Sequence, residues 1–162
     1  MDQVIIEEYK DIDKDDVVEL ILTIQNSEFG IPITLAMQPD LHGIAGYYQI
    51  NNGNFWVAKS GDQIIGTIAL LDIGHQQAAL RKMFVNRVHR GKAWGVGQKL
   101  LTTLVDSAKR AGIKEIFLGT TEKFTRAQQF YEKNGFTEIL KQELPGSFPV
   151  MDVDVKFYRF NV

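Results

Sequence analysis

The stretch RVHRGKAWGVGQKLL, residues 87–101, decides the fold. An apolar run over residues 78–85 leads into it and predicts a strand, while leucines at 100, 101 and 104 lead out of it at helical spacing. The first N–H groups of a helix have no intrahelical partner, and glycines let an anion approach them closely. Because this segment also carries basic side chains and no acidic ones, it indicates a site for a phosphate-bearing ligand.

The charge distribution supports this interpretation. The chain has 162 residues and a formal net charge of −2, but residues 81–99 carry six basic and no acidic side chains. Residues 1–20 carry eight acidic side chains against two lysines, a net of −6. The acidic stretch either forms a solvated helix face or attracts a cationic amine substrate.

Length and composition limit the classes of protein. The length suits one globular domain, and no apolar run approaches the roughly 20 residues that span a bilayer. The N-terminus has no basic segment leading into an apolar one, so we expect no secretory signal and a cytoplasmic protein without a membrane partner. The absence of cysteine excludes disulfides, thiolate–metal sites and a cysteine nucleophile, and we expect no metal.

The rest of the chain predicts alternating strands and helices. Residues 4–6 form a first strand, and apolar residues recur at helical spacing from residue 17. Asp40 is expected to cap a short helix, and Thr125 and Gln128 to form a capping box before a helix that ends at Gly135. Further strands are expected at residues 55–58, 64–71, 116–118 and, by alternation, 153–157.

The glycine spacing excludes two common phosphate motifs. Neither Gly91 nor Gly95 begins the spacing of a nucleotide P-loop, and Leu100 stands where a dinucleotide fingerprint needs its third glycine. Taken alone, the segment leaves a solvated basic helix start as an equal alternative.

Two motifs together resemble the GNAT superfamily of acyl-CoA N-acyltransferases. Arg90-Gly91-Lys92 followed by Gly95-Val96-Gly97-Gln98-Lys99-Leu100-Leu101 resembles the family's pyrophosphate loop, and RAQQFYEKNGF, residues 126–136, resembles its second signature. The resemblance implies a single α/β (α+β) domain over residues 1–162. Its sheet is expected to be mixed and mostly antiparallel, with six to seven strands and about four flanking helices.

The resemblance also assigns a site for acetyl-CoA, the expected cosubstrate. Backbone amides near Phe84 and Val85 would hold the thioester carbonyl, and the loop would hold the pyrophosphate. Two registers are open for this loop, one using Ala93 and Gly95, the other using Lys92, Gly95 and Gly97; the second is favoured. The loop is then two residues longer than the common family pattern. The implied cofactor-binding residues are Phe84, Val85, Arg90, Gly91, Lys92, Ala93, Trp94, Gly95, Val96 and Gly97.

The implied reaction is direct attack of an amine on the thioester in a ternary complex. Tyr131 stands at the family's tyrosine position and is the expected acid for the leaving sulfur. Glu122 is the first candidate for the base, with Asp72 and His75 behind it. Two departures from the family are present: Ala79 stands where many members have a glutamate, and Phe124 where an asparagine is frequent.

Three functions remain open from the sequence. The main expectation is an enzyme that acetylates a primary amine of a small molecule or a protein. The alternative is a non-catalytic acyl-CoA-binding or regulatory domain. A nucleic-acid binder is disfavoured because the pI is 5.9 and the basic segment is short. Apolar residues in the C-terminal strands would support a homodimer.

Overall fold

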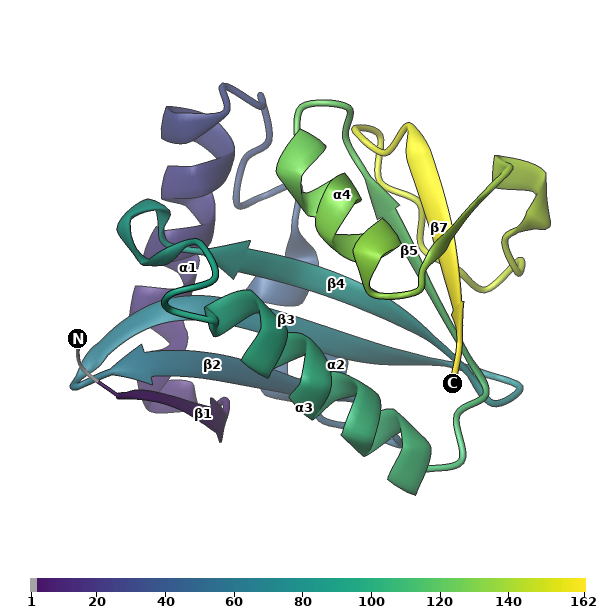
Figure 1. Ribbon diagram of the computed structural model, residues 1–162, viewed down its shortest axis with the longest axis horizontal. Helices are drawn as coiled ribbons and strands as arrows, with labels where there is room; N and C mark the ends of the chain where they lie inside the picture. Colours follow the sequence, from purple (N-terminus) through teal and green to yellow (C-terminus); the bar gives the residue numbers. More distant parts are fainter. Residues whose placement is uncertain (1–2) are drawn as a thin grey trace.

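A computed structural model describes residues 3–162 of the chain. Within them one seven-stranded sheet runs in the order β1-β2-β3-β4-β5-β7-β6 (Figure 1). The predicted α/β fold class, with a mixed and mostly antiparallel sheet, is confirmed; limits at residues 1 and 162 stay a prediction. The strands are β1 Val4–Glu8, β2 Asn54–Ser60, β3 Gln63–Gly74, β4 Gln77–Val85, β5 Glu115–Thr120, β6 Thr137–Ile139 and β7 Lys156–Asn161.

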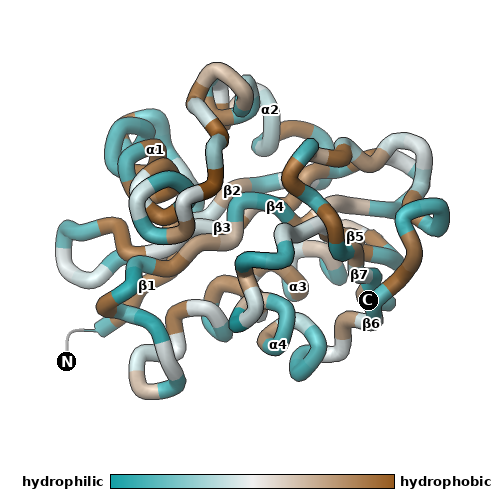
Figure 2. The backbone as a smooth tube through the Cα atoms, turned by 90° about the horizontal axis from the view of Figure 1, so that it is seen from above, coloured by the Kyte–Doolittle hydropathy of each residue, from teal (hydrophilic) through white to brown (hydrophobic). Residues whose placement is uncertain are grey.

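Helices cover both faces of the sheet (Figure 2), with α1 and α2 on one face and α3 and α4 on the other. The helix α1 continues into a π-helical stretch, η2, and short 3-10 turns mark several loops. The helical segments are η1 Asp11–Asp13, α1 Lys14–Leu22, η2 Thr23–Glu28, η3 Pro39–Leu41, α2 Ile44–Tyr48, η4 Arg87–His89, α3 Val96–Arg110, α4 Thr125–Lys133 and η5 Lys141–Glu143.

The helix α3 follows from its apolar stripe. Its buried side chains recur at three- and four-residue spacing and pack against β3, so the sheet covers one face of the helix. Gly112, with φ +77°, follows its last turn, as expected for a helix stop. These buried side chains are Val96, Leu100, Leu101, Leu104 and Ala108.

The sheet opens between β4 and β5, its parallel pair. These strands pair only where Gln77–Ala79 lie beside Glu115–Phe117, although β4 runs on to Val85. Beyond Ala79 the two strands diverge, as Figure 1 shows. Beyond Ala79, the backbone N–H and C=O groups on that side of β4 have no partner in β5 and need other hydrogen-bond partners.

A bulge in β4 lies at the same place. Thr67 pairs with Phe84 and Ala69 with Arg81, so one residue of β3 faces two of β4. Lys82 has φ +52° there, and Thr67 Oγ1 donates to its carbonyl at 2.7 Å. A bulge turns consecutive side chains toward one face of a sheet. Arg81 and Lys82 accordingly both reach the α1/α2 face.

Several local predictions were wrong. Asp40 does not cap a helix: it lies within η3, and its buried carboxylate accepts a hydrogen bond from Tyr48 Oη at 2.5 Å. Thr125 and Gln128 form no capping box, because Phe124 and not Thr125 is the N-cap of α4, and the Gln128 amide donates to Thr121 O at 3.0 Å. The final strand starts only at Lys156, since residues 151–155 form turns that hold other contacts.

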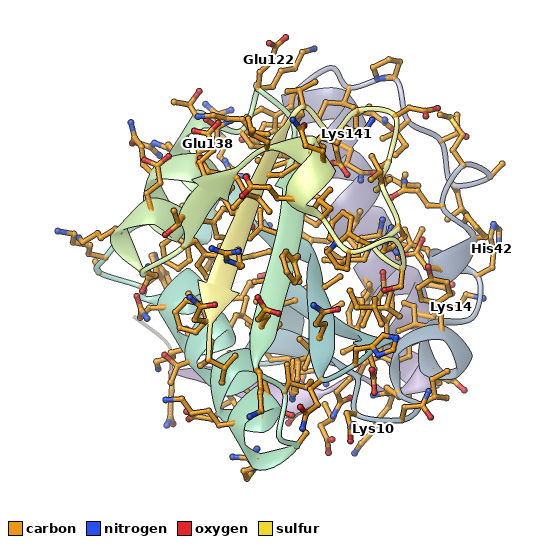
Figure 3. All side chains as sticks on the ribbon, turned by 90° about the vertical axis from the view of Figure 1, so that its right-hand side faces the viewer. Lys10, Lys14, His42, Glu122, Glu138 and Lys141 are labelled. Atoms are coloured by element: carbon orange, nitrogen blue, oxygen red, sulfur yellow. The ribbon has the colours of Figure 1, made fainter. Side chains whose placement is uncertain are left out.

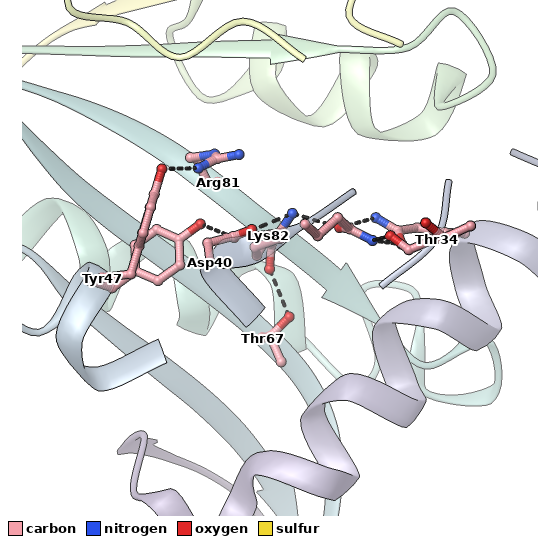
Figure 4. Close-up of polar contacts among 9 residues, drawn as sticks. Thr34, Asp40, Tyr47, Thr67, Arg81 and Lys82 are labelled. Atoms are coloured by element: carbon pink, nitrogen blue, oxygen red, sulfur yellow. Dashed lines mark hydrogen bonds and ion pairs between the residues drawn. The ribbon is translucent and has the colours of Figure 1, made fainter. Parts of the chain in front are cut away.

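Lys82 is the centre of a buried polar network (Figure 4). Its ammonium donates to Gln38 Oε1 at 2.7 Å and lies 3.4 Å from Asp40 Oδ2, and both charged side chains are 3% exposed. Gln38 in turn exchanges hydrogen bonds with Gln25 of η2. Burial lowers the pKa of Lys82 to about 8, and the Asp40 carboxylate opposes this shift. The network fixes η2 and η3 against β4.

In the described residues, no helix combines the length and apolar character needed to cross a membrane. The same part of the chain holds no group of three or more His, Asp or Glu side chains placed to bind a metal ion.

We expect Lys82→Met to lower the free energy of unfolding by about 3–5 kcal/mol, because the Asp40 carboxylate is left buried without its cation. Urea denaturation at neutral pH measures this loss. Lys156→Met is the control: Lys156 pairs with the half-exposed Glu138 at 3.6 Å, and its loss is expected to stay within about 1 kcal/mol. Equal losses in both variants would contradict the structural role of the network.

Candidate active site

A cleft of about 620 Å³ lies beside the end of β4, between the loop at residues 90–95 and α4. The end of β4, the first turn of α3 and one side of α4 form its walls. Residues around the end of η2 close it from a fourth side. The lining residues are Ile24, Phe29, Met83, Phe84, Val85, Arg90, Gly91, Lys92, Gly95, Gly97, Gln98, Lys123, Phe124, Thr125, Arg126, Ala127, Phe130, Tyr131, Lys133 and Asn134.

The cleft is cationic. Five of its lining side chains are basic, and none is acidic. The close side-chain contact with Lys92, and after it the repulsion between the two charges, lowers the pKa of Lys133. Two like charges brought together without an intervening carboxylate favour an anionic ligand. The five basic residues are Arg90, Lys92, Lys123, Arg126 and Lys133.

The loop places free backbone donors in this cleft. Gly95 has φ +65° and is the N-cap of α3, and its carbonyl accepts the first helical hydrogen bond, from Lys99 N at 3.0 Å. The N–H groups of Val96, Gly97 and Gln98 precede that bond and have no intrahelical partner. An anion at this end of α3 also gains from the helix dipole.

Arg90 is a structural anchor for the loop. Its Nε donates to Val85 O at 2.9 Å, and its two terminal nitrogens form a bidentate pair with the Glu28 carboxylate. Glu28 ends η2, so the pair joins the N-terminal helical region to the loop. Because Glu28 neutralises Arg90, the free positive charge of the cleft comes from its lysines and Arg126.

The structure brings most of the sequence-predicted cofactor residues together. Seven of the ten line the cleft: Phe84, Val85, Arg90, Gly91, Lys92, Gly95 and Gly97. Ala93 is exposed, Trp94 packs edge-on against His89 at 4.6 Å, and Val96 is buried in the core, so none of these three lines it. Gly95 and Gly97, the glycines of the favoured register, both line the cleft, and Ala93 does not; which register binds the ligand stays a prediction.

Tyr131 lies at the inner end of the cleft. Its ring packs against Phe136 and Tyr158 at 5.5 and 6.2 Å between centroids, and the side chain is 5% exposed. No hydrogen-bond partner for its hydroxyl is present within residues 3–162. Burial raises the pKa of Tyr131 well above its usual value, so the hydroxyl keeps its proton at neutral pH.

The candidate bases lie elsewhere. Glu122 is exposed, lines no cleft, and points outward at the edge of the molecule (Figure 3). Asp72, near the end of β3, and His75, in the β3–β4 turn, lie at the opposite end of β4 from the cleft. Ala79 is fully buried in the core beside Phe117. The structure therefore brings none of these residues to Tyr131.

A second, smaller cleft of about 80 Å³ lies on the α1/α2 side of the opening between β4 and β5. Its walls come from β4, β5, residues 31–33 and the loop before β7. It shares lining residues with the larger cleft, so the two meet where the strands diverge. The shared residues are Met83, Phe84, Phe124 and Tyr131.

Comparison with known proteins defines the class. The sequence profile of the acetyltransferase (GNAT) family matches residues 18–136. A crystal structure of a GNAT-family acetyltransferase from Staphylococcus aureus Mu50 is 42% identical, with a TM-score of 0.94 over 98% of both chains. An acetyltransferase structure from Streptococcus agalactiae 2603 is 33% identical, with a TM-score of 0.94 over 100% of both chains.

More distant relatives share part of the chain. Probable N-acetyltransferase 14 of Xenopus tropicalis is 34% identical over 121 residues, which are 74% of this chain and 58% of that protein. N-acetyltransferase 8F1 of Rattus norvegicus is 29% identical over 109 residues, 64% of this chain and 48% of that protein. The chain spans about half the length of these two relatives.

The chain belongs to the acetyltransferase (GNAT) family. The expected class, a GNAT-family N-acetyltransferase with the fold that binds acetyl-CoA, is thereby confirmed. At the level of fold alone, the PaiA N-acetyltransferase of Thermoplasma acidophilum, solved with coenzyme A, is 18% identical with a TM-score of 0.74.

Sequence reasoning missed part of the site. The basic side chains Lys123, Arg126 and Lys133 flank or lie on α4, and only their shared proximity to the cleft distinguishes them from a solvated helix face. Arg81 and Lys82 were counted only as charge, because alternation along a strand does not reveal a bulge. The residue type of Lys82 does not predict its positive φ.

We expect Gly95→Ala to lower the free energy of unfolding by about 1–2 kcal/mol, because alanine is strained at φ +65°. Gly97→Ala is the matched control. Gly97 lies in the first turn of α3, where an added Cβ would lie 3.5 Å from Met83 Cε, an ordinary contact. It is expected to retain or slightly gain stability, as thermal and urea denaturation would measure. A Gly95→Ala variant as stable as Gly97→Ala would contradict the left-handed cap.

Proposed function

We propose that this protein transfers the acetyl group of acetyl-CoA to a primary amine, by direct attack in a ternary complex. One observation carries the proposal: a large cationic cleft and a small cleft that holds three charged residues meet at Met83, Phe84, Phe124 and Tyr131. A phosphate-bearing thioester and an amine entering from opposite sides would bring their reacting ends together there. Such an arrangement removes the need for a covalent enzyme intermediate.

The larger cleft suits coenzyme A. The free N–H groups at the start of α3 and the ammonium of Lys92 would bind the pyrophosphate. Lys133 and Arg126 would compensate further phosphate charge. Phe84 and Val85, at the end of β4 beyond its pairing with β5, would offer backbone donors to the thioester carbonyl, and so to the oxyanion that develops on it.

The proposed reaction is a direct transfer of the acetyl group from sulfur to nitrogen. The neutral amine attacks the thioester carbonyl carbon, and a C–N bond forms. The C–S bond then breaks, and the leaving thiolate takes the proton of the Tyr131 hydroxyl. The proton lost by the amine leaves the site to a base, and Tyr131 is reprotonated from solvent. Tyr131 suits the acid role because it is buried, protonated and free of a competing hydrogen bond among the described residues.

The identity of the base stays a prediction. Glu122 is exposed and outside both clefts, so a proton would reach it only through water. An amine that arrives neutral needs no such group. A cytoplasmic location and a homodimer likewise stay predictions.

The coenzyme A part is tested by calorimetry with acetyl-CoA. We expect Lys92→Gln to weaken binding about 3- to 10-fold, because one charge-assisted contact to phosphate is lost, and to reduce the dependence of the Kd on salt. Lys109→Gln, in the exposed last turn of α3 and outside the cleft, is expected to bind like wild type. No binding of acetyl-CoA to the wild-type protein would overturn the proposed function.

The chemical step is tested by Tyr131→Phe. We expect kcat to fall about 100-fold or more, with acetyl-CoA affinity changed less than about 2-fold, because only the proton donor is removed. Since burial raises the pKa of Tyr131, the wild type is expected to show no alkaline loss of kcat from this group up to about pH 10. Thiol release with an amine panel over pH 6–10 measures both effects.

Tyr158→Phe is the matched control for the tyrosine. Its hydroxyl donates to Glu132 Oε2 at 2.7 Å and lines neither cleft, so its removal is expected to reduce stability and not kcat. Unchanged turnover in Tyr131→Phe would exclude the acid role. Acetyl-CoA binding without turnover on any amine would favour the non-catalytic acyl-CoA-binding alternative.

A further inference from the structure

The smaller cleft has an unusual charge arrangement. Of its charged lining residues, Arg81 and Lys82 come from β4, and Asp154 comes from the loop before β7. The bulge in β4 puts the two basic side chains on the same face, where regular alternation would separate them. The charged side chains that line the cleft are therefore two cations and one carboxylate.

Lys82 is already neutralised. Its ammonium pairs with the buried Asp40 carboxylate at 3.4 Å and donates to Gln38, so its charge is used within the protein. In Figure 4 the dashed contacts run from Asp40 through Lys82 toward Thr34, and none of them joins Arg81 to this network.

Arg81 has no such partner. Its Nη1 donates to the neutral Tyr47 hydroxyl at 3.1 Å, and it forms no ion pair with any carboxylate of residues 3–162. The guanidinium also lies over the Tyr47 ring, 5.8 Å from its centroid. Tyr47 therefore orients a half-buried guanidinium, and the Asp40 carboxylate acts on its charge only without direct contact. A partly desolvated guanidinium of this kind is a strong binding group for a ligand carboxylate.

Asp154 lies in the loop before β7 and packs against Gly119 of β5. Its Oδ2 accepts from Met151 N at 3.0 Å, and a Cβ added at Gly119 would lie only 2.7 Å from that oxygen, so the carboxylate rests on the backbone of β5. Burial raises the pKa of Asp154, while the charges of Arg81 and Lys82 act in the opposite direction. Asp154 forms no direct ion pair with either of them within the described chain. Asp154 is thus a second charged group without a direct ion-pair partner in the described chain, of opposite sign to Arg81.

We infer that the acetyl acceptor is a small amine that itself carries a carboxylate, of the amino-acid class, with Arg81 binding its carboxylate and Asp154 its ammonium group, which loses one proton to solvent before it attacks as the neutral amine. This inference rests on the proposed function and names the acceptor of that reaction. A polyamine would leave Arg81 facing another cation, and an uncharged amine would leave it without a partner. The cleft, at about 80 Å³, is also much smaller than the coenzyme cleft and suits a short acceptor.

The test compares each of the common L-amino acids with its own carboxamide, which keeps the amine and removes the negative charge. Thiol release from acetyl-CoA measures kcat/KM for every pair. We expect at least one free acid to exceed its amide by about 10- to 100-fold, the range of one charge-assisted hydrogen-bonded contact. The carboxamide amine is the less basic of the two, so this preference cannot come from easier deprotonation.

Arg81→Gln is the decisive variant. It is expected to reduce kcat/KM for the preferred acid by about 10- to 100-fold, mainly through KM, while the amide changes by no more than about 3-fold. Arg81→Lys keeps the positive charge but loses the bidentate geometry of the guanidinium. Its kcat/KM for the preferred acid is expected to lie between those of wild type and Arg81→Gln. Arg110→Gln, an exposed arginine at the end of α3 and outside both clefts, is the control and should match wild type.

Asp154→Asn tests the ammonium contact, with Asp152→Asn as its neighbour control. Asp152 is exposed and lines neither cleft. Asp154→Asn is expected to reduce kcat/KM for the preferred acid by about 10-fold or more. Its melting temperature should equal or exceed that of wild type at neutral pH, since burial disfavours the charged carboxylate that the change removes.

The outcomes separate the two proposals. Amino acids that neither react nor bind to the coenzyme A-loaded protein, no acid–amide preference, or an Arg81→Gln effect equal on both members of a pair, would overturn the acceptor inference. Acetylation of polyamines or peptides in that case leaves the proposed function intact. Absence of acetyl-CoA binding overturns the function itself. Normal melting and acetyl-CoA affinity of each variant confirm that it is folded.

Discussion

The structure depends on two neighbouring irregularities of β4. One is the bulge at Arg81 and Lys82, and the other is the early end of the pairing between β4 and β5. Three residues of each strand pair, and then the strands part. Both clefts open at this parting, one on each face of the sheet. The bulge also turns two cations into the smaller cleft. A regular parallel pair would give a continuous sheet and no meeting point for two substrates.

The buried Lys82–Asp40 pair maintains the bulge. A buried ion pair contributes little net stability compared with apolar packing, but it is costly to break, so it specifies one arrangement. Here it ties the bulge to η3 and, through Gln38 and Gln25, to η2. Glu28, at the end of η2, holds Arg90 of the phosphate loop. Polar contacts made by two residues of η2 therefore connect the side of the smaller cleft with the loop of the larger one.

Much of this arrangement was predictable from sequence. The strand, glycine loop and helix around residues 78–110 follow from periodicity and from the glycines, and seven of the ten residues expected around the ligand line the cleft. Tyr131 was found only through family resemblance. The rest depended on tertiary contacts: Asp40 looked like a helix cap because its partners, Tyr48 and Lys82, are distant in sequence. Asp154 was predicted within a strand at residues 153–157, yet it lies in a loop and rests against Gly119.

The short contact between β4 and β5 divides the sheet into a four-stranded wing and a three-stranded wing, joined along only a few residues. The proposed coenzyme site draws Arg90 and Lys92 from the connection after β4 and Lys133 from α4, which precedes β6, so it spans the seam between the wings. A ligand lying in that seam would occupy the place of the missing interstrand hydrogen bonds. If the proposed function holds, bound acetyl-CoA connects the two parts of the sheet, and the loaded protein has a more continuous sheet than the free one.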